Sequence, residues 1–253
     1  MHRSASRLTR ILACAAVPVM LVVAGCSSDP GDGSGDADGS STSPTARPSA
    51  TVAPAKFTGL PDACATLGRK TIDSLVPKAK IKGGSAGKSS DITARASCSW
   101  NGLDDNGVKG SQYRWLDVSL TRYDSDVTLG SGAERATEYY TKELAGAKGT
   151  EGAKELKAAP ASGIGSEATT ITYSLTKTGE DFAYATVVAR TENVVVTLTY
   201  NGAGYAGAKS PGVADMSKDA VAAAKEAVTA VSVGSGQTPA TGESAAQESA
   251  KAE

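Results

Sequence analysis

Alternating apolar and polar residues predict five β-strands in the middle of the chain. The clearest case is the second strand, where Leu116, Val118 and Leu120 alternate with polar side chains. This pattern is typical of a strand with one face on a core and the other toward water. Short turns between the last three strands predict an antiparallel meander. The expected strands span residues 94–100, 112–123, 169–176, 182–190 and 193–200.

Three further segments carry apolar residues at helical spacing. Ser131 and Glu134 form a capping box at the start of the second segment, which fixes where that helix begins. Cys64 lies on the apolar face of the first segment, so we expect its thiol to point toward the core. The expected helices span residues 60–76, 132–145 and 211–231.

The order of these elements is helix, two strands, helix, three strands, helix. Separate runs of strands joined by tight turns predict an α+β domain. We expect a single twisted antiparallel sheet of about five strands, with the helices packed on one face, the face that carries Leu116, Val118 and Leu120. This domain is expected to span residues 57–233.

The N-terminus has the pattern of an export signal. Arg3, Arg7 and Arg10 precede an apolar stretch, residues 11–24, which is too short to be a typical membrane-spanning helix. The stretch ends in the run Val-Ala-Gly-Cys at residues 23–26, which resembles a lipobox. That resemblance implies cleavage after residue 25 and a diacylglyceryl group on Cys26, which would hold the chain on the outer face of the cytoplasmic membrane.

Two segments lack the large apolar residues that a core needs. Residues 26–56 are rich in Gly, Ser, Asp, Thr, Ala and Pro, and residues 234–253 have a similar composition. Such segments cannot bury enough apolar surface to fold. We therefore interpret residues 26–56 as a lipid anchor with a disordered linker, and residues 234–253 as a disordered tail.

Cleavage before Cys26 changes the chemistry that the chain can perform. It removes three arginines and no acid, which leaves 23 Lys and Arg against 27 Asp and Glu, a net charge of −4. This balance argues against nucleic acid as a partner. Cleavage also removes His2, the single histidine. Histidine-dependent catalysis and histidine metal sites are then excluded, so we expect a non-catalytic protein with no metal or cofactor.

Two of the four cysteines remain free in the mature chain. Cys14 leaves with the signal peptide and Cys26 is used by the lipid, which leaves Cys64 and Cys98. Two cysteines in an oxidising compartment usually pair, and closing a loop of about 34 residues stabilises a fold by about 4 kcal/mol. The alternative is a reactive thiol.

Three short motifs resemble ligand-binding loops but lack the required context. Residues 163–168 fit a dinucleotide fingerprint, yet a strand pattern follows where that motif needs a helix. Residues 83–89 are one residue short of a phosphate-binding loop and follow no strand. Residues 104–107, and the pair Asp124 and Asp126, lack further calcium ligands. We interpret all three as turns or loops.

Four aromatic residues on the first two strands form a possible ligand surface. Trp100 and Trp115 lie on adjacent strands, and Tyr113 and Tyr123 lie on the second. Trp115 alternates with Leu116 and Val118, so it shares the polar face of its strand. An aromatic floor there could bind a lipid, glycan or peptide, whereas a core or cross-strand pair is the alternative.

Several of these features occur together in one known family. They are the lipobox, the low-complexity linker, Cys64 after a proline, the Cys-Ser-Trp strand at residues 98–100, and the Gly-Ser-Glu-Ala turn at residues 165–168. The chain resembles actinobacterial lipoproteins that carry domain of unknown function 3558. The resemblance covers about residues 61–231 and implies a disulfide-linked α+β domain outside the membrane, with no catalytic residues to carry over.

The leading functional hypothesis is a membrane-tethered binding or adaptor module of the cell envelope, expected to be a monomer with an unknown envelope ligand or protein partner. The first alternative is an envelope enzyme that uses a lysine or carboxylates such as Glu167, Glu180 and Asp181. The second alternative is a structural spacer lipoprotein without a ligand.

Overall fold

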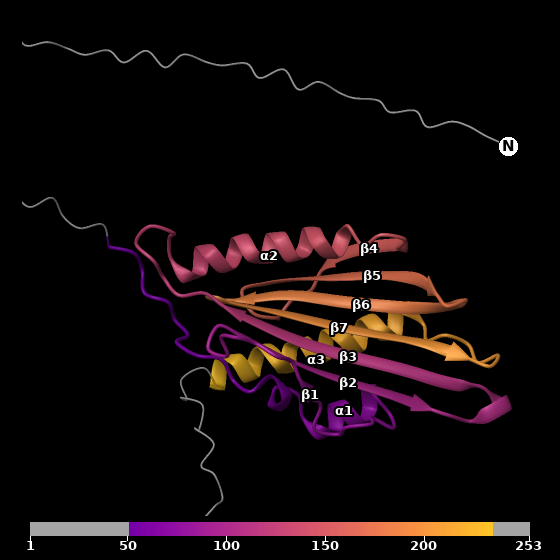
Figure 1. The fold of residues 1–253 in the computed structure, drawn as a ribbon. Helices are drawn as coiled ribbons and strands as arrows, with labels where there is room; N and C mark the ends of the chain where they lie inside the picture. Colours follow the sequence, from indigo (N-terminus) through magenta and orange to yellow (C-terminus); the bar gives the residue numbers. More distant parts are fainter. Residues whose placement is uncertain (1–50, 235–253) are drawn as a thin grey trace, which may run out of the picture. The chain divides into compact units, whose positions relative to one another are not determined.

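The computed structural model describes residues 51–234, which build one seven-stranded antiparallel sheet (Figure 1). The strand order is β1-β2-β3-β7-β6-β5-β4. The hairpin β2–β3 and the meander β4–β7 meet where β3 pairs with β7 in the middle of the sheet. The strands are β1 (Ser85–Ala86), β2 (Arg95–Asp104), β3 (Ser111–Arg122), β4 (Lys154–Pro160), β5 (Glu167–Lys177), β6 (Glu180–Thr191) and β7 (Val194–Tyr205).

Helices cover both faces of this sheet (Figure 1). On β6, Ala185 and Val187 contribute to the core shared with α3, whereas the alternating Tyr184 and Val188 contribute to the core shared with α2. The face with α3 also carries the first helical segments. The helices are η1 (Ala63–Ala65), α1 (Arg69–Leu75), η2 (Gly107–Lys109), α2 (Gly132–Lys148) and α3 (Val213–Gly234).

The α+β class and the antiparallel sheet are confirmed, but two details of the prediction are wrong. The described sheet has seven strands instead of about five. The prediction missed β1 and β4, because β1 has only two residues and β4 is exposed along almost its whole length, so neither carries an apolar alternation. The helices do not share one face. Residues 182–189 of β6 are buried on both sides, which requires a cover on each face.

The predicted first helix is broken at Gly68 into η1 and α1. Gly68 offers no side-chain cap, and Glu226 of α3 supplies one instead: its carboxylate accepts from the Gly68 amide at 2.5 Å and from Thr71 Oγ1 at 2.6 Å. The disulfide between Cys64 and Cys98 is confirmed and joins η1 to β2. Both contacts hold this segment on the α3 face.

Asn193, in the turn between β6 and β7, fixes the place where the chain enters the domain. Its buried side chain accepts from the Phe57 amide at 2.9 Å and donates to the carbonyls of Phe57 and Tyr123, each at 2.8 Å. The end of β3 and the start of the domain are thereby tied to one side chain. The loop that leads from Tyr123 into α2 begins at this point.

Two of the three loop motifs are in the places expected for turns. Residues 163–166 form the turn that leads into β5, and no helix follows them. Residues 83–89 are a loop that contains β1. Among the helices of residues 51–234, none is both long and apolar enough to span a bilayer. The predicted signal peptide, Cys26, most of the linker and residues 235–253 lie outside the described residues.

Candidate functional site

A groove runs along one side of α2, over the strands that this helix leaves uncovered. Helix α2 packs on β5, β6 and β7, so the same face of β2 and β3 stays open. Two hollows lie there, and both are lined by Tyr139 of α2. We call the two together the α2 groove, the first the aromatic hollow and the second the polar hollow.

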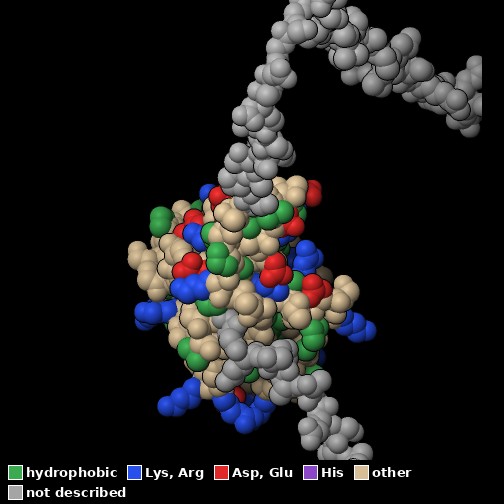
Figure 2. Space-filling view, turned by 90° about the vertical axis from the view of Figure 1, so that its left-hand side faces the viewer, with side chains coloured by type: hydrophobic (Ala, Val, Ile, Leu, Met, Phe, Trp, Pro, Cys, Tyr) green, Lys and Arg blue, Asp and Glu red, His purple; other side chains and the backbone are tan. Residues whose placement is uncertain are grey.

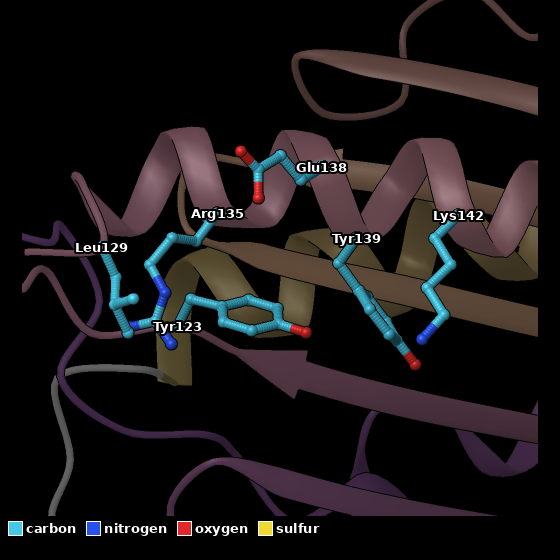
Figure 3. A pocket seen from close by; sticks show the side chains of 6 residues that line it. All are labelled: Tyr123, Leu129, Arg135, Glu138, Tyr139 and Lys142. Carbon is cyan, nitrogen blue, oxygen red and sulfur yellow. The ribbon is translucent and has the colours of Figure 1, made fainter. Parts of the chain in front are cut away.

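The aromatic hollow has a volume of about 360 Å³ and lies between α2, the end of β3 and the loop that joins them (Figure 3). The Arg135 guanidinium lies 5.2 Å from the Tyr123 ring centroid, and the rings of Tyr123 and Tyr139 are 5.6 Å apart. In Figure 3, Tyr139 and Lys142 point toward the strands, whereas Glu138 points away from the two rings. The lining residues are Tyr123, Leu129, Arg135, Glu138, Tyr139 and Lys142.

The spacing of residues on α2 explains why these side chains converge. Positions 135, 139 and 142 are four and three residues apart, so they lie on one side of the helix. The capping box at Ser131 and Glu134 fixes the first turn and therefore the direction in which this side faces. Arg135 is held further by its Nη1, which donates to the Asp124 carbonyl at 2.7 Å.

The polar hollow has a volume of about 350 Å³, and its floor is a grid of four side chains from two paired strands. Ser97 lies directly opposite Ser119, and Arg95 lies opposite Thr121. Because successive residues of a strand point to opposite faces, all four share the face toward Tyr139. The lining residues are Lys88, Ser89, Ser90, Arg95, Ala96, Ser97, Ser119, Thr121 and Tyr139.

Among the described residues, the cations of the α2 groove form no ion pair with an acid. In the described part of the chain, Lys88, Arg95, Arg135 and Lys142 form no salt bridge, and Glu138 is the one acid in the lining of either hollow. Figure 2 shows Lys, Arg, Asp and Glu side chains mixed over the end of the domain at the left of Figure 1. Within residues 51–234, the groove is therefore distinguished by four cations that form no salt bridge.

The pKa values of the groove tyrosines reflect burial and neighbouring charges. Burial raises the pKa of Tyr123, and the charges of Arg95 and Arg135 oppose that rise. Both guanidinium groups are thus close enough to act on one ring. Burial, followed by the Glu143 carboxylate, raises the pKa of Tyr139. Both tyrosines stay neutral near pH 7 and can act as hydrogen-bond donors.

One unpaired carboxylate lies beside the groove. Asp117 is two residues from Ser119 on the same face of β3, and burial raises its pKa to about 6. Within residues 51–234 its side chain has no hydrogen-bond or salt-bridge partner. Trp115, two residues further along, extends this open face of the strand.

The structure does not bring the four predicted aromatic residues together. Trp100 lies opposite Leu116 and is buried in the core on the α3 side, so it cannot share a surface with Trp115. Tyr113, Trp115 and Tyr123 do lie on the α2 side of β3, but at different places along it. Tyr113 contacts the Phe182 ring at 6.1 Å, and only Tyr123 lines the α2 groove.

The carboxylates considered for catalysis do not meet in either hollow. Glu167 accepts from Arg190 at 2.6 Å, across the pair β5–β6. Glu180 and Asp181 begin β6 at the other end of that pair, where Asp181 accepts from Thr176 at 2.6 Å. These contacts support the two ends of the hairpin.

The acids considered as calcium ligands are used by their own turns. Asp105 accepts from the Gly107 amide and from Ser111 Oγ, and Asp126 accepts from two amides of its loop. Asp124 pairs with Arg122. Among residues 51–234 no three Asp, Glu, His or Cys side chains lie close enough together to hold a metal ion.

Comparison of the chain with protein-family models and with curated proteins gives no match. Among solved structures it is similar to LpqN of Mycobacterium tuberculosis, which is described as involved in cell envelope biogenesis. The identity is 16%, the alignment covers 56% of this chain and 82% of LpqN, and the TM-score is 0.27. A similarity at this level carries no argument about function.

Proposed function

We propose that this chain is a membrane-tethered lipoprotein of the cell envelope, held at the outer face of the cytoplasmic membrane by a diacylglyceryl group on Cys26. Its folded domain acts as a non-catalytic binding module, and the ligand lies in the α2 groove. The observation that carries the proposal is the convergence there of aromatic rings with four cations that form no salt bridge within residues 51–234. Such a set recognises a partner by stacking and by charge.

The chemistry of the groove favours binding over catalysis. Loss of His2 with the signal peptide leaves the mature chain without imidazole, the most common general base. The side chains of the groove supply donors and rings, and its one acid, Glu138, points away from both rings (Figure 3). Glu167, the carboxylate favoured for an enzyme, is paired with Arg190.

A screen with a blocked variant tests the binding role. The melting temperature of the full chain is measured with cell-wall fragments, envelope lipids and peptides, because a ligand of the native state must raise it. Ser119→Phe fills the floor of the polar hollow, and Ser74→Phe places the same ring at an exposed position of α1, on the other side of the sheet, as the control.

At about a hundred times its Kd, a ligand should stabilise the domain by about 2.7 kcal/mol, or several degrees. Ser119→Phe should reduce this shift and Ser74→Phe should preserve it. If every class of compound leaves the melting temperature unchanged, or if both variants respond like the native chain, the groove is not the binding site.

The anchor has a separate test. The chain expressed in an actinobacterial host is fractionated, and its mass is compared with that of Cys26→Ser. We expect the native protein in the membrane fraction with the added mass of a diacylglyceryl group, and the variant outside that fraction without it. A native chain that lacks this mass would refute lipidation at Cys26.

A further inference from the structure

We infer that the polar hollow is a subsite for a tetrahedral oxyanion, and that the ligand of the α2 groove carries a phosphoryl group there. This inference rests on the proposed function and assigns a chemical class to its ligand. It follows from three features of the polar hollow: its cations, its hydroxyl groups and the position of the nearest acids.

The cations come from two separate segments and face one space. Lys88 lies in the loop after β1, and Arg95 begins β2. Neither forms a salt bridge within residues 51–234, although three other pairs form there. An ammonium and a guanidinium that line the same hollow without an acid leave it positively charged. A phosphoryl group would neutralise this charge and accept hydrogen bonds from both.

The floor supplies hydroxyl donors in a fixed arrangement. Ser97 and Ser119 lie opposite each other on β2 and β3, and the structure gives their side chains no hydrogen-bond partner among the described residues. Paired strands place such side chains about 5 Å apart, so two oxygens of one phosphoryl group can each accept from one serine. Tyr139 closes the side toward α2.

The nearest acids do not occupy this space. Asp91 accepts from Thr93 and from the Ala94 amide, within its own loop. Glu143 accepts from Thr197 at 3.4 Å and its carboxylate also faces Tyr139, whose pKa it raises, but Glu143 itself does not line the polar hollow. Asp117 lies two residues along β3 and does not line the polar hollow. Among the described residues, the lining itself therefore contains two cations, several hydroxyl groups and no acid.

Binding of phosphate itself tests this assignment. Calorimetry on the full chain measures the affinity for inorganic phosphate and for glycerol 3-phosphate, with sodium chloride at matched ionic strength as the salt control. Arg95→Gln removes the guanidinium and Lys88→Gln the ammonium. Arg69→Gln and Lys70→Gln make the same changes of charge at exposed positions of α1, on the other side of the sheet.

We expect both probes to bind the native chain. A lost charge-assisted hydrogen bond should weaken binding about tenfold in Arg95→Gln and about threefold in Lys88→Gln. The α1 variants should bind as the native chain does, and Arg95→Lys should keep part of the affinity because it retains the charge. No binding of either soluble probe, or equal losses in the α1 variants, would overturn the assignment.

Vesicles distinguish the source of the phosphoryl group. Phosphatidylglycerol vesicles that compete with glycerol 3-phosphate, when phosphatidylcholine vesicles do not, would identify a lipid headgroup as the natural source. Failure of anionic vesicles to compete, with soluble phosphate still bound, would identify a soluble or wall-bound phosphate. If wall fragments stabilise the chain through the groove but phosphate does not bind, this inference fails and the proposed function stands.

Discussion

Replacement of Asn193 by alanine should destabilise the whole domain although it removes only one small side chain. The Asn193 side chain is fully buried and makes three hydrogen bonds to backbone groups. Two of these hold Phe57, where the chain enters, and one holds Tyr123, which lines the aromatic hollow. The substitution therefore tests how the candidate site is connected to the rest of the fold.

The size of the effect follows from the groups that lose their partner. The Phe57 amide and the Tyr123 carbonyl lose the Asn193 side chain, whereas the Phe57 carbonyl still accepts from Arg122 Nη1 at 3.3 Å. Each unpaired buried group costs about 1–3 kcal/mol, which gives about 2–6 kcal/mol in total. We expect about 3 kcal/mol if water reaches one of the two groups.

Urea unfolding followed by tryptophan fluorescence measures this difference. With an m-value of about 2 kcal/mol per molar urea, the midpoint should fall by about 1.5 M. Asn106→Ala is the matched control, because Asn106 is exposed and its side chain makes no capping hydrogen bond. Asn193→Asp should be worse than Asn193→Ala, since it sets a carboxylate against two carbonyl oxygens. A loss below about 0.5 kcal/mol in Asn193→Ala would refute this reasoning.

Three further changes are expected to give measurable results. Replacing both Cys64 and Cys98 by alanine should lower the free energy of unfolding by about 4 kcal/mol in urea, since the bond closes a 34-residue separation; an unchanged midpoint would contradict this. Burial raises the pKa of Asp117 to about 6, so the native chain loses stability as the pH rises from 4 to 6. Asp117→Asn should therefore match the stability of the native chain near pH 4 and exceed it by about 1 kcal/mol above pH 6. A difference in stability that stays constant across pH would count against this. Gly84→Ala should lower the melting temperature by several degrees, because a Cβ there would lie 2.7 Å from the Trp100 ring at a φ of +81°; Gly83→Ala, where a Cβ meets no atom, is its control.

The sequence predicts those parts of the fold in which local pattern and tertiary packing agree. The alternation around Val118 places β3, and the capping box at Ser131 places the start of α2. Helix α2 continues past Gly146 to Lys148, because a single glycine weakens a helix without by itself ending it. No residue of strand β4 is buried, so the sequence there has no apolar alternation that would predict a strand.

The candidate site was harder to predict, because its residues come from segments that only the strand pairing brings together. Trp100 and Trp115 lie on adjacent strands, but the strand register pairs Trp100 with Leu116. The two indoles therefore lie on opposite faces of the sheet. Arg135, Tyr139 and Lys142 share one side of α2, and that spacing was a signal available in the sequence. Nothing local to Lys88 or Arg95 indicates that they line one hollow with Tyr139.

The central claim is that the ligand of this domain lies in the α2 groove. The most direct test is fluorine NMR of the full chain labelled with fluorotyrosine, titrated with the envelope fraction that raises its melting temperature. The account predicts that the signals of Tyr123 and Tyr139 shift together, while the signal of Tyr205, which contacts Phe182 outside the groove, stays in place. A ligand that stabilises the chain yet leaves the signals of Tyr123 and Tyr139 unchanged would contradict it.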